Sequence, residues 1–376
     1  MIIGITTDFI RGERGVPGNG GAHYEVISQL AAQHPEHRFF LFYSTSVEGF
    51  QPRLPPNVIL QKKPAYKHAL LQKLWYDVQL VRLLKKYKVD VLLSMEGYSS
   101  STSKVPQCLL LQESYSSDGL ATQKKKGQPF YRWLLPGFLS RAGSVIAGSI
   151  RQKEHLESLH GSRSNKIQVV YGGMSPINEV LPAEVKAQVR QQYTESMEYF
   201  IYEGPMLTQN VLPVLKAFSL FKKRQQTSWK LVLSGWEEER EKGFDKLLGS
   251  YKYRQDVVLA GSLNKEERIR LEGSAYGAID TYPDHQSISP ALAWMQRGVP
   301  YLGASSNPLT EISPDAALFF NPDDPADTAE KFMQLYKDEA LHAALTHKGL
   351  ALAKEYSWRR TADLIWENLL RLHSSQ

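Results

Sequence analysis

The chain has 376 residues, of which 42% are hydrophobic and 22% charged, and this length predicts two domains of roughly 150 to 200 residues. This composition is typical of a soluble globular protein and excludes fibrous and low-complexity classes. The single cysteine, Cys108, excludes an intrachain disulfide framework and a multi-cysteine metal site, and it favours a reducing cytoplasm. No apolar run approaches the roughly 20 residues of a spanning helix, and the first residues indicate a strand, not a signal peptide.

The net charge of +6 is unevenly distributed along the chain. Residues 1–180 contain 22 Lys and Arg against 13 Asp and Glu, whereas the remainder contains 23 against 26. We therefore expect the first half to face an anionic partner. The sequence contains no recognisable nucleic-acid-binding module, so nucleic acid is not an expected partner.

Strand-like apolar runs alternate with helical patterns from the N-terminus to about residue 172. In chain order they are IIGITTD, a helix at about 22–33, RFFLFYS, VILQKK, VDVLLSM, PQCLLLQE and SVIAGS. This alternation predicts parallel strands with crossover helices, which is a doubly wound, Rossmann-like α/β domain.

A Gly-, Pro- and Asn-containing stretch, GGMSPINEVLP, then predicts an interdomain connection, and a second alternating set covers residues 190–357. Its elements are YFIYEG, a helix at about 211–224, WKLVLSG, DVVLAG, a helix at about 265–273, GAIDTY, a helix at about 290–297, VPYLGA and ALFF. Two such domains would face each other across a ligand cleft. Periodicity alone leaves any two-domain α/β chemistry open.

The stretch YPDHQSISPALAWMQRGVPYLGASS, residues 282–306, resembles the donor motif E-G-F-G-L-P-x-L-E-A-M-A-x-G-x-P of family-four retaining glycosyltransferases. The residues in register with that motif are Pro290, Leu292, Met295, Gly298 and Pro300. The resemblance covers most of the chain. It implies the GT-B fold, with residues 1–172 as the acceptor-side domain, a final helix at about 358–376 returning to it, and residues 190–357 as the donor-side domain.

The charged residues of that family's donor site are replaced in this sequence. The two glutamate positions hold His285 and Ala293, and the arginine and lysine that contact the donor diphosphate correspond to Pro205 and Gln209. A one-residue slip would bring Asp284 to the first position, but Pro290 and Gly298 would then lose register. Two lost ionic hydrogen bonds cost about 3–6 kcal/mol, or two to four decades in donor affinity or rate.

The resemblance also assigns candidate residues to each domain. Catalytic candidates are His285, Glu113 at the acidic position of the family's "H-D" pair, and His23 beside a glycine-rich loop. Candidates for binding the donor are Gly20, Gly21, Gly204, Gln209, Asn210, Ser287, Ile288, Ser289 and Pro290. Glycines and helix N-termini let backbone N–H groups approach a phosphate or sugar, although a glycine cluster is also common in an ordinary turn. Lys216 and Arg297 are candidates to supply missing positive charge. No metal or cofactor is expected, because the nucleotide sugar acts as co-substrate.

Two basic stretches with aromatic residues account for the charge of the first half. Residues 62–88 place Leu70, Leu71, Leu74, Val78, Val81 and Leu84 at helical spacing, which favours a crossover helix whose apolar stripe packs on the sheet. The second stretch sets Lys124, Lys125 and Lys126 near Trp133. In glycosyltransferases that this chain resembles, such features meet an anionic membrane surface, which would place the protein at the inner membrane face.

Two functions remain as hypotheses at this point. The first is a retaining hexosyltransferase that moves a hexose from a nucleotide diphosphate sugar to a glycan or lipid-linked acceptor in polysaccharide biosynthesis. The second is a catalytically inactive homologue that serves as a binding or scaffold subunit, which the replaced charges favour.

Overall fold

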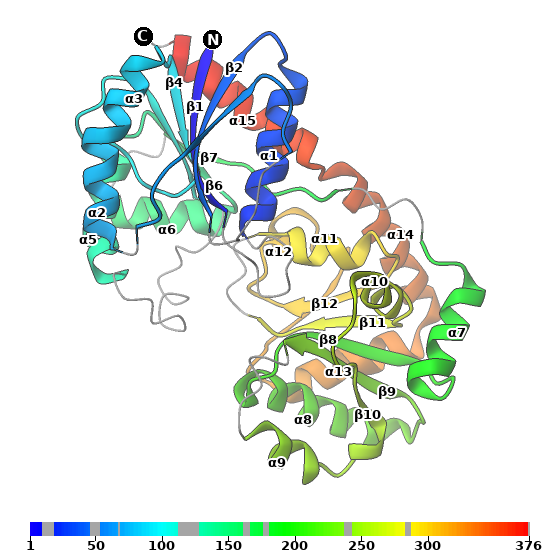
Figure 1. The fold of residues 1–376 in the computed structure, drawn as a ribbon. Helices are drawn as coiled ribbons and strands as arrows, with labels where there is room; N and C mark the ends of the chain where they lie inside the picture. The colour runs from blue at the N-terminus through cyan, green and yellow to red at the C-terminus, as the bar shows by residue number, and fades with distance from the viewer. Residues whose placement is uncertain are drawn as a thin grey trace. The chain divides into compact units, whose positions relative to one another are not determined.

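The computed structural model of the chain describes residues 1–9, 19–45, 53–66, 68–111, 128–160, 166–175, 180–236, 243–282 and 287–374. The chain divides into two compact units, each with its own sheet and core (Figure 1). Unit 1 comprises Met1–Gly173 and Trp358–Gln376, and unit 2 comprises Met174–Ser357.

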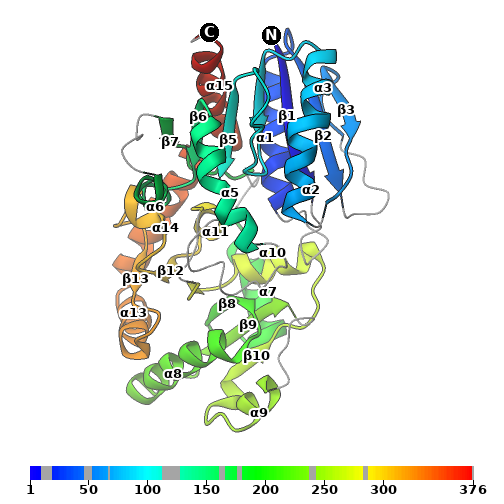
Figure 2. The ribbon, with the colours of Figure 1, turned by 90° about the vertical axis from the view of Figure 1, so that its left-hand side faces the viewer.

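Unit 1 is built on a seven-stranded parallel sheet with the order β3-β2-β1-β4-β5-β6-β7. Its strands are β1 (Ile2–Phe9), β2 (Arg38–Thr45), β3 (Val58–Lys62), β4 (Val91–Ser94), β5 (Gln107–Leu111), β6 (Ser144–Ala147) and β7 (Ile167–Val169). Its helices are α1 (Asn19–Gln33), α2 (Ala69–Leu74), the π-helical turn η1 (Trp75–Gln79), α3 (Leu80–Lys86), α5 (Gln128–Arg141), α6 (Ile150–His160) and α15 (Trp358–Ser374). Strands β4, β5 and β6 are buried along their whole length because helices cover both faces of the sheet (Figures 1 and 2).

Helices α1 and α15 cover one face of this sheet, and α2 to α3 cover the other (Figure 1). The last helix of the chain is held by aromatic stacking, since the Trp366 ring lies 3.9 Å from His34 and 4.9 Å from His37 between ring centroids. The His37 imidazole in turn contacts the N-terminal amine of Met1 at 3.0 Å. The C-terminal helix therefore completes the core of the N-terminal unit.

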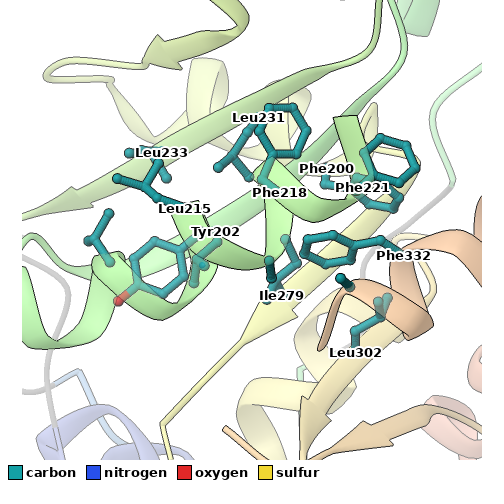
Figure 3. Close-up of a cluster of buried hydrophobic side chains, with 14 of the residues drawn as sticks. Phe200, Tyr202, Leu215, Phe218, Phe221, Leu231, Leu233, Ile279, Leu302 and Phe332 are labelled. Atoms are coloured by element: carbon teal, nitrogen blue, oxygen red, sulfur yellow. The ribbon is translucent and has the colours of Figure 1, made fainter. Parts of the chain in front are cut away.

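Unit 2 has a six-stranded parallel sheet with the order β10-β9-β8-β11-β12-β13. Its strands are β8 (Tyr199–Pro205), β9 (Lys230–Trp236), β10 (Val257–Leu259), β11 (Gly277–Asp280), β12 (Tyr301–Ala304) and β13 (Leu318–Phe320). Its helices are α7 (Ala183–Thr194), α8 (Thr208–Gln225), α9 (Phe244–Gly249), the 3-10 turn η4 (Arg254–Asp256), α10 (Lys265–Gly273), α11 (Ser289–Met295), α12 (Leu309–Ile312), α13 (Pro325–Lys337) and α14 (Glu339–Glu355). The rings of Phe200, Phe218, Phe221 and Phe332 join α8 and α13 to the sheet (Figure 3).

The predicted doubly wound architecture is confirmed for both units. In each sheet the strand order reverses beside the first strand of the unit, between β1 and β4 in unit 1 and between β8 and β11 in unit 2. In open parallel sheets, ligands bind outside the carboxyl ends of the two strands that flank this reversal. The strand order thus identifies one candidate edge in each unit.

Candidate functional site

The reversal point of unit 2 is lined by the carboxyl ends of β8 and β11. Tyr202 of β8 places its ring in the core and its hydroxyl beside this edge (Figure 3). Side chains of Asn210 in α8 and Thr281 after β11 hydrogen-bond the hydroxyl, while burial and the nearby Asp280 carboxylate raise the pKa of Tyr202. Gly204 is required here because a Cβ at that position would lie 2.7 Å from the Tyr202 hydroxyl oxygen. Two predicted site residues, Gly204 and Asn210, therefore both lie next to the Tyr202 hydroxyl.

A second polar chain continues from Asp280, the last residue of β11. The Tyr301 hydroxyl donates to Asp280 Oδ2 at 2.8 Å, and Asn307 Nδ2 donates to the same Tyr301 oxygen at 2.9 Å. Asp280 Oδ1 also accepts a hydrogen bond from the Tyr282 backbone N–H at 2.9 Å. Tyr301 and Asn307 are fully buried, whereas Asp280 is half-buried. The edge thus contains a carboxylate that the sequence analysis did not single out.

Helix α11 presents hydroxyls at its first turn. The Ser287 hydroxyl oxygen accepts a hydrogen bond from the Ser289 backbone N–H at 3.2 Å and lies 3.0 Å from the Ser289 hydroxyl. Pro290 has no N–H, and the Ile288 side chain is completely buried. The first turn therefore offers hydroxyls to a ligand more readily than backbone amides. His285, the predicted catalytic residue, lies outside the described residues.

The two candidate cations of unit 2, Arg297 and Lys216, lie in different surroundings. Arg297 lies 3.1 Å from the buried Glu272 carboxylate and donates to the Ala293 carbonyl oxygen. Arg268 pairs with Glu272 and with Glu203 at the end of β8, at 3.6 Å in each case. Gln209 in the first turn of α8 and Lys216 farther along this helix are both exposed. Arg297 thus stabilises the fold of unit 2 as part of an internal ion network.

In unit 1, the glycine-rich segment differs from the loop that the sequence predicts. Helix α1 begins at Asn19, so Gly20 and Gly21 lie in its first turn and not in a loop before it. Their backbone N–H groups are consequently those of a helix N-terminus, which suits an anion or a sugar oxygen. Glu113, the other predicted acid, lies outside the described residues.

His23 lies one turn into α1 and connects this helix to the end of β1. Its Nδ1 is 2.9 Å from the Thr7 hydroxyl. Burial lowers the pKa of His23 to about 4, and the nearby Asp8 carboxylate offsets only part of that effect. The imidazole is therefore neutral at physiological pH and can offer one donor and one acceptor.

Beside the reversal point of unit 1 lies an ion network that the sequence analysis missed. Lys63, just after β3, places its Nζ 2.7 Å from Asp8 Oδ1 in β1 and 3.0 Å from Glu96 Oε2 after β4. Ser44 of β2 donates to Asp8, and Gln72 of α2 donates to Glu96. In the sequence, a polar residue lies at or just after the end of each of the strands β1 to β4. Only the strand order, however, shows that these four strand ends are adjacent.

The helix that runs through α2, η1 and α3 contradicts the expected packing of its apolar stripe. Leu70, Leu71, Leu74 and Val78 are exposed, the first and third by 54% and 51%, while Val81 is half-buried and Leu84 is buried. The sheet instead receives Trp75 and Tyr76, and the Tyr76 hydroxyl bonds Thr6 at 2.7 Å and Ser94 at 3.0 Å. The helix thus exposes apolar side chains to solvent and turns a partly polar face toward the sheet. The π-helical turn η1 buries Trp75 and Tyr76, and the Tyr76 hydrogen bonds fix this face of the helix toward the sheet.

Trp133 of α5, a helix that contacts α2, is 73% exposed. Together, Leu70, Leu71, Leu74, Val78 and Trp133 are called the apolar face below. Lys124, Lys125 and Lys126 lie outside the described residues. Within the part of the chain that the structure describes, no helix is both long and apolar enough to cross a bilayer. The same residues contain no group of three or more His, Cys, Asp or Glu side chains suited to a metal ion.

Sequence comparisons match part of the chain to known proteins. No family model matches. O-antigen chain mannosyltransferase B of Escherichia coli is 25% identical over 180 residues, which is 47% of each chain. The serotype-specific mannosyltransferase WbdA of Escherichia coli is 27% identical over 170 residues, or 44% of this chain and 21% of WbdA. The match thus spans less than half of the length of these curated relatives.

Comparisons with solved structures cover almost the whole chain. A glycosyltransferase from Rickettsia africae has a TM-score of 0.74 at 12% identity, covering 99% of this chain and 98% of that one. HepE of Anabaena, solved with UDP and glucose, has a TM-score of 0.68 at 16% identity and covers 99% and 100% of the two chains. WaaG, a glycosyltransferase involved in lipopolysaccharide biosynthesis, has a TM-score of 0.67 at 13% identity, covering 98% and 99%. The predicted fold class, GT-B with two Rossmann-like units, is confirmed.

Proposed function

We propose that this protein is a glycosyltransferase that transfers a hexose from a nucleotide diphosphate sugar to a glycan or a lipid-linked acceptor in polysaccharide biosynthesis. The observation that supports this most is the combination of a GT-B fold with partial similarity to two mannosyltransferases. The motif in residues 282–306 favours a family-four enzyme with a retaining mechanism and without a metal cofactor.

In this proposal the donor lies at the reversal point of unit 2. Gly204, Gln209, Asn210 and the hydroxyls of Ser287 and Ser289 contact the nucleotide sugar, and His285 contacts its sugar or phosphate. Gly20, Gly21, His23 and Glu113 are the proposed site residues of unit 1. The donor site is atypical because hydroxyls and amides replace cations. A neutral donor group contributes about 0.5–1.5 kcal/mol per hydrogen bond, less than a charged one.

Calorimetric titration of the protein with UDP, GDP and their sugars tests this proposal. We expect binding in the micromolar range for one nucleotide. Gln209→Ala should weaken it by about two- to tenfold, the equivalent of one neutral hydrogen bond. Gln191→Ala, an exposed glutamine in α7, is the matched control and should leave affinity unchanged. Binding no tighter than millimolar for every nucleotide would contradict the transferase and favour the inactive binding or scaffold subunit.

The second part of the proposal is that the apolar face of unit 1 binds a membrane. This contact would place the protein on the cytoplasmic surface of the inner membrane. Exposing apolar side chains to water is unfavourable. Association with a bilayer would bury the side chains of the apolar face in its interfacial region. Exposed Arg82, Lys85 and Lys86 follow on α3, and Lys124 to Lys126 precede α5, so positive charge accompanies this face. Anionic lipids complement such a surface.

Sedimentation with vesicles measures this association. Vesicles containing phosphatidylglycerol should retain the protein better than phosphatidylcholine vesicles, and added salt should weaken retention by screening. The double variant Leu70→Ser/Leu74→Ser should lower the partition coefficient at least about tenfold, since each leucine contributes about 1.5–3 kcal/mol when fully buried. Leu370→Ser, an exposed leucine on α15, serves as control. Equal retention of both variants would refute the assigned surface.

A further inference from the structure

A groove between α7 and α10 lies on the surface of unit 2, where these two helices contact each other (Figure 1). It has a volume of about 590 Å³, and Leu181, Val185 and Ile269 form its apolar walls. Val180, next to Leu181 in the chain, is 37% exposed and adds a further apolar side chain to this surface. The groove includes none of the residues proposed to bind the donor, so its surface is available for a different partner.

Two cations beside the apolar walls have no charged partner. Lys265 and Arg270, both on α10, line the groove. Among the residues that the structure describes, neither side chain forms an ion pair or a hydrogen bond. Arg268 of the same helix, by contrast, pairs with Glu272 four residues later. Arg270 is half-buried, so its unpaired charge at an apolar surface suits the carboxylate of a partner.

The form of the groove favours a helix over a small molecule as its occupant. Its walls come from two neighbouring helices, so a small ligand would leave much of its surface in water. Small-ligand sites typically bury roughly 70–90% of the ligand surface. The channel between two packed helices instead accepts the side chains of a third helix. The matching helix would present an apolar side chain close to a carboxylate.

The outer face of α15, in unit 1, has this chemistry. The inner face of α15 packs into the core through Ile365, Trp366 and Leu369. On the outer face, Leu370 is 40% exposed, and Glu367 lies three residues before it and is also exposed. Residues three apart lie on the same side of a helix. Within the described part of the chain the Glu367 carboxylate forms no ion pair, so it is available to a cation of another molecule.

The charges of the two surfaces match in spacing and in sign. On α15, Arg371 follows Glu367 by four residues, and on α10, Arg270 follows Glu266 by four residues, which is about 6 Å along either helix. In an antiparallel arrangement Glu367 lies opposite Arg270, and Arg371 then lies opposite Glu266. A parallel arrangement would place like charges together, which opposes association. Leu370, between the two charged residues of α15, faces the apolar walls.

We propose that the groove between α7 and α10 of one molecule binds the outer face of α15 of a second copy of this chain. The contact joins two different surfaces, so it is heterologous and generates either a closed ring or an open chain of molecules. One groove and one helix face form a small interface, and we therefore expect weak association that depends on concentration. The inference goes beyond the proposed function, because neither surface contains a residue proposed to bind the donor or the membrane.

Analytical ultracentrifugation of the full chain tests the proposal. The weight-average mass should rise above the 42.6 kDa of one chain as the concentration increases, and added salt should reverse the rise by screening. Arg270→Glu and Glu367→Arg should each raise the Kd of self-association at least about tenfold, as loss of a charged hydrogen bond does. Lys246→Glu on α9 and Glu154→Arg on α6 are the matched controls at exposed positions and should leave it unchanged.

Charge exchange identifies the two residues that face each other. The double variant Arg270→Glu/Glu367→Arg should regain self-association, because it forms the same pair with reversed signs. An equimolar mixture of the two single variants should also associate, which shows that the contact joins two molecules. Circular dichroism verifies folding, and Arg270→Gln replaces Arg270→Glu if the latter unfolds. A wild-type chain that stays monomeric at every concentration, association that neither single variant weakens, or no recovery in the double variant and the mixture overturns the proposal.

Discussion

Replacing Lys63 with methionine should lower the free energy of unfolding by about 3–5 kcal/mol, because it leaves the buried Glu96 and the half-buried Asp8 carboxyl groups without their cation. Methionine retains most of the side-chain length, so the loss of packing is small. Urea denaturation followed by circular dichroism measures the change. The matched control is Lys348→Met, which removes an exposed pair with Asp315 and should alter stability little.

The double variant Lys63→Met/Glu96→Gln gives an internal test of this first prediction. Glu96 is the more buried of the two carboxyl groups, so Glu96→Gln should restore part of the lost stability. The non-additivity of the two changes measures their coupling. If Lys63→Met costs less than about 1 kcal/mol, the network contributes little to folding.

The second large effect is expected from restoring the charges that the donor motif lacks. The combined variant Pro205→Arg, Gln209→Lys, His285→Glu and Ala293→Glu should tighten nucleotide diphosphate binding by two to four decades, corresponding to about 3–6 kcal/mol. Pro205 is the last residue of β8, and Gln209 is exposed in the first turn of α8, so cations there would face the same strand end. Titration calorimetry measures the gain.

Gln191→Lys controls for the position of an added cation, because it places one positive charge on α7 instead of α8. An improvement of less than about threefold in the combined variant would show that the reversal point of unit 2 does not hold the diphosphate. The Asp280 carboxylate opposes phosphate binding at this edge. Asp280→Asn added to the combined variant should therefore tighten binding further.

Much of the fold could be predicted from the sequence because buried parallel strands are largely apolar. The runs VDVLLSM and PQCLLLQE contain β4 and β5, and the helical patterns match α8, α10 and α11 within a few residues. The start of α1 was wrong by three residues, because glycines weaken the helical signal although they permit a helical first turn. The prediction that the apolar stripe of α2 to α3 packs on the sheet was wrong, because residue spacing shows that one face is apolar but not what covers that face.

The candidate site could be predicted only in part. The motif in residues 282–306 located α11, and the changed charges at Pro205 and Gln209 are visible without coordinates. Asp280, Tyr301 and Asn307 were missed because their hydrogen bonds join residues that are 6 and 21 positions apart on different elements. Arg297 resembled a ligand-binding cation by position, whereas its partner, Glu272, lies on another helix.

The amino-acid sequence by itself determined the alternation of strands and helices, a length sufficient for two domains, and the differences from the resembled donor motif at four charged positions. These properties depend on local periodicity and on residue identity. Only the tertiary structure decided which strand ends are neighbours, and hence that Asp8, Lys63 and Glu96 form one network. The physical reason is that strand order is set by crossover connections and sheet pairing, which act over dozens of residues and leave no periodic trace in the chain.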